Sequence, residues 1–164
     1  MATTAPTQLT EDLMLLLGQT AHALSAELTA GLEGLGISPR GHCVLSKALS
    51  GELTQGEVAQ LCDLDKTTMV VTMDELERAG LAERRAATAD RRARIIAVTP
   101  AGKRKAAEAA EIVASINDDV LSALPARERQ TFVRALERLA EGRLSAPAKC
   151  ERPVRRPRSA STSV

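Results

Sequence analysis

The sequence predicts a mainly α-helical protein that carries one small β-hairpin. Apolar residues recur at the three-to-four-residue spacing of helices through most of the chain. Cap residues such as Ser, Thr and Asp precede these segments, and Gly or Pro punctuates them. One region, which ends in Ile95, Ile96 and Val98, has instead the β-branched character of strands. At 164 residues the chain is long enough to bury a core without disulfides or metals.

Two helices are expected before residue 51. Thr10, followed by two acidic residues, is predicted to cap a helix that runs to about Leu32, and Gly34 and Gly36 then break it. Ser38 and Pro39 are predicted to open a second helix that ends at Ser50–Gly51. The first helix is expected to bury Leu13, Leu17, Leu24 and Leu28. The second helix carries the apolar residues Val44, Leu45 and Leu49.

The next two helices have the pattern of a helix-turn-helix. Thr54 and Glu57 have the spacing of a capping box, and the short helix that they open should bury Val58, Ala59 and Leu61. After a tight turn, Asp65 is predicted to cap a helix that runs to about Ala79, with Gly80 as its stop. Its predicted core face is formed by Met69, Met73 and Leu76. Two short helices joined by a tight turn, the second capped and amphipathic, make this motif.

A hairpin and two further helices complete the expected elements. The strands are predicted at Leu81–Arg85 and Arg94–Val98, and a hairpin directly after a helix-turn-helix is a wing. Thr99 and Pro100 are predicted to begin a long helix that runs to about Ala123, and Pro125 opens the last helix. The apolar residues expected on these helices are Ile112, Val113, Ile116, Val120, Leu121, Phe132, Val133, Leu136 and Leu139. From residue 145 the chain is rich in Pro, Arg and Ser and is expected to be disordered.

The formal net charge of +1 hides a strong segregation along the chain. Residues 1–77 have three basic and eleven acidic side chains, whereas residues 78–105 have nine basic and two acidic ones. A local excess of seven positive charges in the region of the wing is the kind of field that attracts phosphate.

Several classes of function are disfavoured. Phe132 is the chain's one aromatic residue, so stacking on single-stranded nucleic acid is not expected. We find no nucleophile with a base, no glycine-rich phosphate loop and no paired carboxylates beyond helix caps, so we expect neither an enzyme nor a cofactor. No apolar run reaches the length of a membrane span, and nothing resembles a signal peptide. We expect a cytoplasmic protein with reduced cysteines.

The order of elements, together with four short motifs, resembles the MarR family of bacterial transcriptional regulators over about residues 10–143. The motifs are Leu64–Thr68, Leu76–Leu81, Asp90–Arg94 and Val98–Gly102. The resemblance implies a homodimer whose first and last helices form the interface. It also implies a helix from Asp65 in the major groove, a wing tip in the minor groove, and a ligand pocket between the dimerisation and DNA-binding parts.

These observations divide the chain into four regions. Residues 1–9 are a flexible N-terminus, and residues 10–36 and 100–144 form a helical dimerisation region. Residues 37–99 form a winged helix-turn-helix DNA-binding region, and residues 145–164 form a disordered basic tail.

The candidate DNA contacts lie on the helix from Asp65 and on the wing. N-terminal residues of such a helix reach base edges, Lys66 suits phosphate, and Arg suits a narrow minor groove. The candidates are Lys66, Thr67, Thr68, Val71, Thr72, Arg84, Arg91, Arg92 and Arg94. The resemblance implies that Asp90 supports the wing by pairing with Arg92. Family members often carry an Arg or a polar residue where this chain has Val70 and Val71.

The candidate ligand pocket is lined by Leu17, His22, His42 and Cys43, with Arg40 or a His available to an acidic group. We interpret Cys43 and Cys62 as small buried hydrophobic residues. We expect no metal and no membrane partner. The predicted function is sequence-specific regulation of transcription, by repression, through a palindromic operator in double-stranded DNA and release by a small apolar or phenolic effector. A thiol- or metal-responsive regulator of the same fold, and a helical protein-interaction module without DNA binding, are the alternatives.

Overall fold

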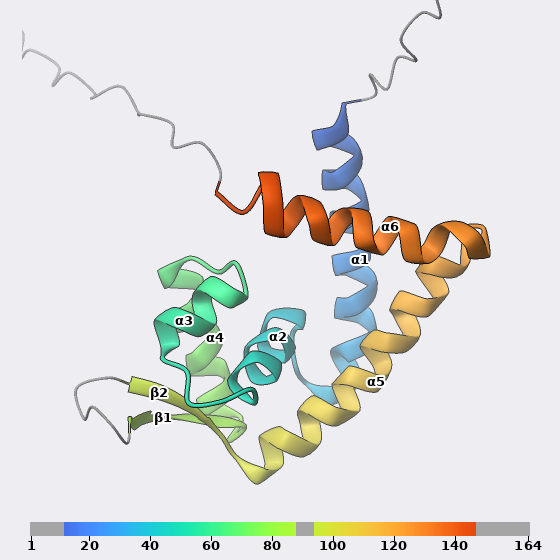
Figure 1. The fold of residues 1–164 in the computed structure, drawn as a ribbon. Helices are drawn as coiled ribbons and strands as arrows, with labels where there is room; N and C mark the ends of the chain where they lie inside the picture. The colour runs from blue at the N-terminus through green and yellow to red at the C-terminus, as the bar shows by residue number, and fades with distance from the viewer. Residues whose placement is uncertain (1–11, 88–93, 147–164) are drawn as a thin grey trace, which may run out of the picture. The chain divides into compact units, whose positions relative to one another are not determined.

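The computed structural model describes residues 12–87 and 94–146, and it confirms a mainly helical chain with one two-stranded hairpin (Figure 1). Its residues fall into two compact units, one up to Val120 and one from Leu121, which are described separately. The helices of the first unit are α1 (Leu13–Leu32), the 3-10 turn η1 (Glu33–Leu35), α2 (Pro39–Ala48), α3 (Gln55–Leu61), α4 (Lys66–Arg78) and α5 (Pro100–Ser122, ending in the second unit). The strands are β1 (Ala82–Ala86) and β2 (Arg94–Val98).

Side-chain caps begin the first two helices. The Asp12 carboxylate accepts hydrogen bonds from the backbone N–H groups of Met14 (3.0 Å) and Leu15 (3.3 Å). Asp12 is therefore the cap of α1 in place of the predicted Thr10, which lies outside the described residues. At α2 the Ser38 hydroxyl accepts from the Gly41 N–H at 3.1 Å, as predicted. Pro39 occupies the first helical position, where its missing N–H costs nothing.

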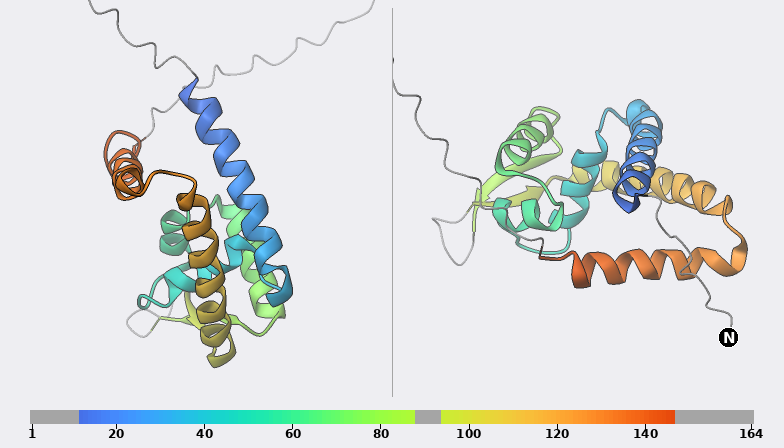
Figure 2. Two further views of the ribbon diagram at one scale, coloured as in Figure 1. Left: turned by 90° about the vertical axis from the view of Figure 1, so that its right-hand side faces the viewer. Right: turned by 90° about the horizontal axis from the view of Figure 1, so that it is seen from above.

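The core of the first unit lies among α2, α3, α4 and the hairpin (Figures 1 and 2). Burying each large side chain of this kind contributes about 1.5 to 3 kcal/mol. The largest fully buried residues are Leu32, Val44, Leu45, Val58, Met69 and Met73. The predicted core face of the fourth helix is thus confirmed, because Leu76 is buried as well.

One predicted core residue of α3 is exposed. Leu61 is 54% exposed, whereas Val58 and Ala59 are buried as predicted. Successive helical residues point about 100° apart, so Val58, Ala59 and the following Cys62 share the inward face and Leu61 turns away from it. Cys62 accordingly packs against the core at the C-terminal end of α3.

The hairpin is antiparallel, with Ala82 opposite Val98 and Ala86 opposite Arg94. β1 begins one residue later than predicted because the Leu81 N–H still bonds the Leu76 carbonyl at 2.9 Å, closing the end of α4 through Gly80 (φ 68°). β2 has the predicted bounds.

A close backbone contact joins the hairpin to α5. The Thr99 hydroxyl accepts from the Gly102 N–H at 3.0 Å and donates to the Gly80 carbonyl at 2.8 Å. A Cβ on Gly102 would lie 1.9 Å from the Leu81 carbonyl oxygen, so only glycine fits at this position.

The two ends of α1 differ in packing. Near its C-terminal end Gly31 lies against α5, because a Cβ there would be 2.6 Å from the Ile116 side chain. Near its N-terminal end Leu13 is 61% exposed in the single chain, which corrects the prediction that Leu13 is buried. All residues from Leu13 to Leu17 are apolar, and a single face of a helix cannot bury consecutive residues. Leu17, Leu24 and Leu28 are half-buried.

The second unit contains α6 (Ala126–Arg138), which Pro125 precedes as predicted, and a π-helical turn, η2 (Leu139–Arg143). The Arg129 guanidinium closes the turn before α6 by donating to the carbonyls of Leu124 (3.0 Å) and Ser122 (3.1 Å). An apolar stripe on α6 remains exposed, with Phe132 46% and Leu136 37% accessible. The predicted tail lies almost wholly outside the described residues.

Candidate nucleic-acid interface

α4 is the element on which the candidate interface is built. The Asp65 carboxylate accepts hydrogen bonds from the backbone N–H groups of Thr67 (2.8 Å) and Thr68 (3.0 Å), and from the Thr68 hydroxyl (2.5 Å). These bonds, led by that of the Thr68 hydroxyl, lower the pKa of Asp65 below its ordinary value. The cap therefore stays ionised at neutral pH and fixes the start of the helix.

The structure separates the candidate residues of α4 into two groups. Lys66, Thr67 and Val71 are exposed, and Val71 keeps 53% of its accessible surface. The Thr68 hydroxyl is held by the Asp65 cap. Thr72 is 3% exposed and donates its hydroxyl to the Thr68 carbonyl at 2.9 Å, so it is not available on the exposed face of the helix.

The exposed face of α4 also carries acidic residues, and Arg84 of β1 binds two of them. The Arg84 guanidinium pairs with Asp74 at 2.8 Å and also with Glu77, whose other carboxylate oxygen accepts the Arg84 backbone N–H at 2.8 Å. Since α4 holds Lys66 and Arg78 against three acidic residues, its formal charge is −1 without Arg84. The positive charge of Arg84 therefore balances the net negative charge of α4.

Arg84 also joins three elements of the winged helix. Its Nε donates to the side-chain oxygen of Gln55 on α3 at 2.9 Å, and one Nη donates to the Val70 carbonyl on α4 at 3.4 Å. The predicted direct contact between Arg84 and DNA is therefore not supported, because its donors are directed at protein groups and its side chain is only 25% exposed. We define the Arg84 clasp as Arg84 with Gln55, Asp74 and Glu77.

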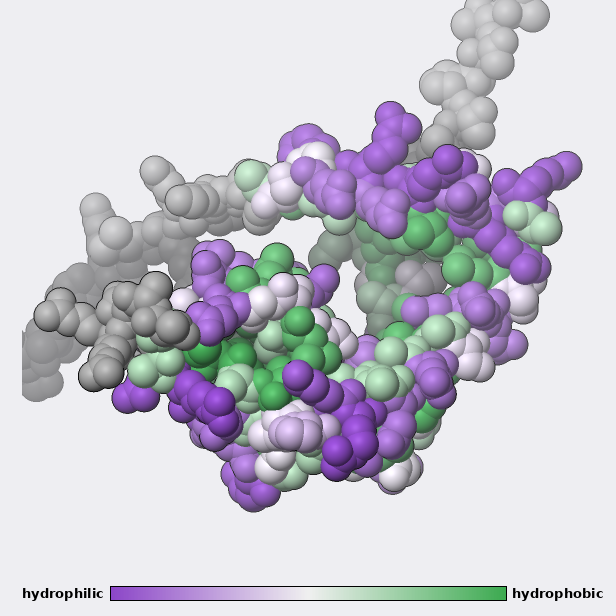
Figure 3. Space-filling model, turned by 60° about the horizontal axis from the view of Figure 1, so that its bottom comes forward, coloured by the Kyte–Doolittle hydropathy of each residue, from purple (hydrophilic) through white to green (hydrophobic). Residues whose placement is uncertain are grey.

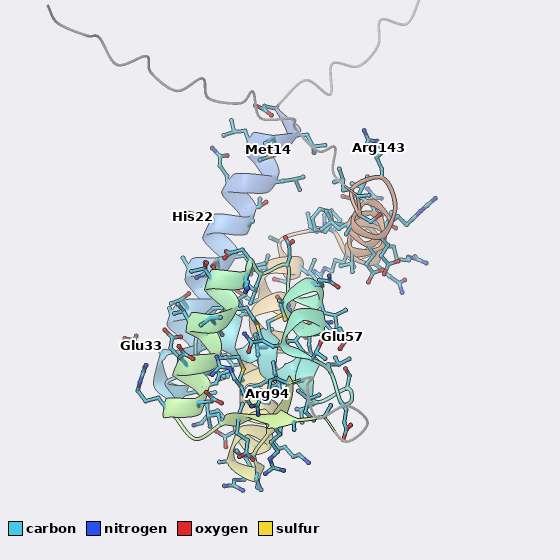
Figure 4. The ribbon with its side chains drawn as sticks, turned by 90° about the vertical axis from the view of Figure 1, so that its left-hand side faces the viewer. Met14, His22, Glu33, Glu57, Arg94 and Arg143 are labelled. Atoms are coloured by element: carbon cyan, nitrogen blue, oxygen red, sulfur yellow. The ribbon has the colours of Figure 1, made fainter. Side chains whose placement is uncertain are left out.

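The described part of the wing presents further cations. Arg94 is exposed at the start of β2 (Figure 4), and Arg85 on β1 pairs with Glu83. Arg91, Arg92 and Asp90 lie outside the described residues, so their roles stay predictions. The winged-helix part of the surface in Figure 3 shows hydrophobic residues among hydrophilic ones.

Two open hollows lie beside α1 in the first unit. A hollow of about 700 Å³ is bordered by α1, η1 and the loop before α2. His22 on α1, labelled in Figure 4, is one of its lining residues. A second hollow of about 380 Å³ lies between α1, the start of α2 and α4. Its lining residues are Ser25, Thr29, Ser38, Pro39, Arg40, Thr67, Thr68, Val71, Thr72 and Glu75. The four predicted pocket residues are not brought together in either hollow, because Leu17, His42 and Cys43 line neither of them.

His42 and Cys43 lie in a different environment on α2. Burial lowers the pKa of His42, and its buried Nδ1 has no hydrogen-bond partner among the residues that the structure describes. The Cys43 Sγ lies 3.1 Å from the Cys62 Sγ, and both residues are half-buried. Burial, followed by the contact with Cys43, raises the pKa of Cys62 to about 12. Within residues 12–87 and 94–146 no cluster of three His, Cys, Asp or Glu side chains is arranged to hold a metal ion.

Sequence reasoning missed the partners of Arg84. Gln55 is 29 positions from Arg84, and nothing in local spacing assigns such a pair. The burial of Thr72 did have a signal, because Thr72 lies three residues after Met69 and four before Leu76, on the predicted core face.

Comparisons with known proteins agree with this geometry. Residues 36–93 match the sequence model of the MarR family. A MarR family regulator from Rhodococcus sp. RHA1 is 26% identical with a TM-score of 0.73, and the match covers 84% of this chain and 96% of that one. CouR from Rhodococcus jostii RHA1, solved with p-coumaroyl-CoA, is 26% identical with a TM-score of 0.72, covering 91% and 100%.

A second structure, of the transcriptional repressor CouR bound to a 23-mer DNA duplex, shows the same fold at 24% identity. Its TM-score is 0.72, and the match covers 85% of this chain and 99% of that one. Among the described helices, none combines the length and apolarity that a membrane crossing requires.

Proposed function

We propose that this chain is a sequence-specific DNA-binding repressor. The premise is its resemblance to the MarR family of transcriptional regulators, both in fold and in the sequence of residues 36–93. It acts in the cytoplasm as a homodimer on a palindromic operator. The observation that carries the proposal is the outer face of α4. A side-chain cap fixes the N-terminal end of this helix, its outward side chains Lys66, Thr67 and Val71 are exposed, and a basic hairpin follows it directly.

The charge distribution supports DNA as the partner. Residues 78–105 contain nine basic and two acidic side chains, and the Arg84 clasp removes the repulsion that Asp74 and Glu77 would exert on phosphate. The neighbouring CouR structure contains a DNA duplex on the same fold. Lys66 and Arg94 are the described residues that we assign to phosphate or groove contacts, and Arg91 and Arg92 complete the proposed set at the wing tip.

The exposed apolar residues of the first and last helices support a homodimer. Met14 is 79% exposed and Leu15 55% near the start of α1, and Phe132 and Leu136 form an exposed stripe on α6. Apolar surface of this kind is covered in stable proteins by a partner. A second copy of this chain is the partner that we propose.

The hollow of about 380 Å³ is the effector site that we propose. Arg40, among its lining residues, supplies a positive charge for an acidic group. Val71 and three threonine side chains form most of the wall on α4, and Glu75 completes it. A small apolar or phenolic acid bound there would lie against Thr67 and Val71, which we assign to DNA. Such a ligand releases DNA to the extent that it binds the free protein more tightly than the bound one.

One observation favours a thiol-responsive regulator as a second candidate. The Cys43 and Cys62 Sγ atoms are 3.1 Å apart and join α2 to the turn before α4. A hydroperoxide could oxidise the two thiols to a disulfide while it is itself reduced to water and an alcohol. Cys43 would attack first, since Cys62 stays protonated at neutral pH. If this candidate holds, hydroperoxide weakens DNA binding, dithiothreitol restores it, and Cys43→Ser removes the response.

Selection of bound duplexes from a random pool tests the proposed function. The proposal predicts a palindromic consensus, with two chains per duplex by light scattering. Failure to enrich any sequence, with a folded protein, would leave a helical protein-interaction module as the better description.

A further inference from the structure

The outer face of α4 presents methyl groups at the place where the proposed interface would meet base edges. Thr67 and Val71 lie one helical turn apart on this face, opposite the buried Met69 and Met73. Val71 is 53% exposed and its neighbour Val70 is 39% exposed. Valine is a poor helix former, so exposed valine adds nothing to the stability of the helix itself.

The other side chains of this helix leave little for hydrogen-bonded base recognition. Before Arg78, at its C-terminal end, α4 contains no Arg, Asn or Gln, and Lys66, the one other residue of this helix that can bind guanine through two hydrogen bonds, is assigned to phosphate. The Thr68 hydroxyl belongs to the Asp65 cap and Thr72 is buried. Asp74 could accept a hydrogen bond from cytosine, but its carboxylate is held by Arg84 at 2.8 Å.

We propose that Val71, with Thr67 beside it, recognises the C5 methyl group of thymine in the major groove. The inference rests on the proposed function and specifies how its operator is recognised. Thymine is the one base that presents a methyl group in this groove. Seated against Val71, the thymine methyl group loses contact with water without leaving a polar group unpaired.

The same contact rejects the other bases. Cytosine would place an amino donor against the valine, and guanine would place acceptor atoms there. Either group would lose its water without gaining a partner, which carries a free-energy penalty. The specificity at this position thus comes from an apolar contact and from the exclusion of polar edges.

Replacing thymine by uracil tests the proposal, because uracil keeps every hydrogen-bonding group and lacks only the methyl. We take the duplex selected by the full-length protein and exchange each thymine for uracil, symmetrically in both half-sites. Burial of one methyl-sized group is worth about fourfold in an equilibrium constant. At one position of each half-site the exchange should therefore raise Kd about 15-fold in the dimer complex, as measured by fluorescence anisotropy.

Two variants assign the effect to a residue. Val71→Ala should weaken binding to the thymine duplex and reduce the uracil effect at that position to less than twofold. Alanine favours helix, so this exposed variant should fold, and its circular dichroism spectrum checks that it does. Val70→Ala is the matched control and should keep the uracil effect at that position. In a duplex with cytosine there, 5-methylcytosine should improve binding by the wild-type protein and not by Val71→Ala.

The outcomes separate the two proposals. If no duplex is enriched, the proposed function is overturned. If a consensus is enriched but uracil changes Kd by less than twofold at every position, thymine-methyl recognition is overturned and the proposed function stands. If the uracil effect survives unchanged in Val71→Ala, the assignment to Val71 is overturned.

Discussion

Replacing Arg84 distinguishes a residue that positions the interface from one that contacts DNA. Arg84→Met keeps the length of the side chain and removes the charge that binds Asp74 and Glu77. The three side chains are 25%, 50% and 33% exposed, so solvent weakens each ion pair to about 0.2 to 1 kcal/mol. With the hydrogen bond to Gln55 lost as well, we expect the free energy of unfolding to fall by about 1 to 2 kcal/mol.

The effect on DNA affinity should exceed this loss of stability. In the proposed dimer, each protomer would expose two uncompensated carboxylates on α4, the helix that we propose faces DNA. At about 8 Å from a phosphate in water, each repulsion is about 0.5 kcal/mol, so four carboxylates amount to about 2 kcal/mol. Arg84→Met should therefore raise Kd about 30-fold, measured by fluorescence anisotropy on the selected duplex.

A rescue experiment decides between the two roles of Arg84. Combining Arg84→Met with Asp74→Asn and Glu77→Gln removes the exposed carboxylates, so the triple variant should recover most of the lost affinity. This recovery should exceed any gain that the two amide substitutions give in the presence of Arg84. Arg85→Met is the matched control, because Arg85 is 63% exposed and pairs only with Glu83 among the described residues. A triple variant that binds as weakly as Arg84→Met would refute the clasp and indicate direct contact with DNA.

Three further predictions follow from individual residues. Because burial lowers the pKa of His42, its folded-state pKa lies below its unfolded-state value, so stability is full above about pH 6.5 and falls as pH drops through the folded-state pKa. Urea titrations should show this acid loss in the wild type and in His22→Gln, and a smaller one in His42→Leu. Gly102→Ala should destabilise the fold by about 3 kcal/mol or more, since its Cβ would lie 1.9 Å from the Leu81 carbonyl oxygen. Gly56→Ala, with open space around the new methyl, should not destabilise it. Arg91→Ala combined with Arg92→Ala should lower the salt dependence of DNA binding by about one unit of slope per lost phosphate contact, with the melting temperature unchanged; an unchanged slope would show that the wing tip does not contact phosphate.

Local features of the fold could be predicted from the sequence because they depend on neighbouring residues. The Ser38 and Asp65 caps and the Thr54–Glu57 capping box act over two or three positions, and the structure forms all three. The β-branched residues of the second strand and the glycine after the fourth helix are local in the same sense.

Features that depend on residues far apart in the chain could not be predicted from the sequence. Arg84 carries the charge expected of a DNA contact, but its role depends on Gln55, Asp74 and Glu77, which the fold brings to it. Leu61 and Cys62 are neighbours with similar hydrophobicity, and only the phase of a two-turn helix determines which faces the core. Likewise, the residues that line the hollow beside α4 come from three separate helices.

The salt dependence of binding to the selected duplex, measured beside a scrambled duplex, tests the central claim most directly. If a dimer binds through α4 and the wing, about six to ten phosphate contacts should form, and log affinity should fall with log salt at a slope of about −5 to −9. The selected duplex should remain at least about 1,000-fold tighter than the scrambled one at physiological salt. Equal affinity for both duplexes, or binding that does not change with salt, would contradict sequence-specific recognition of DNA by this chain.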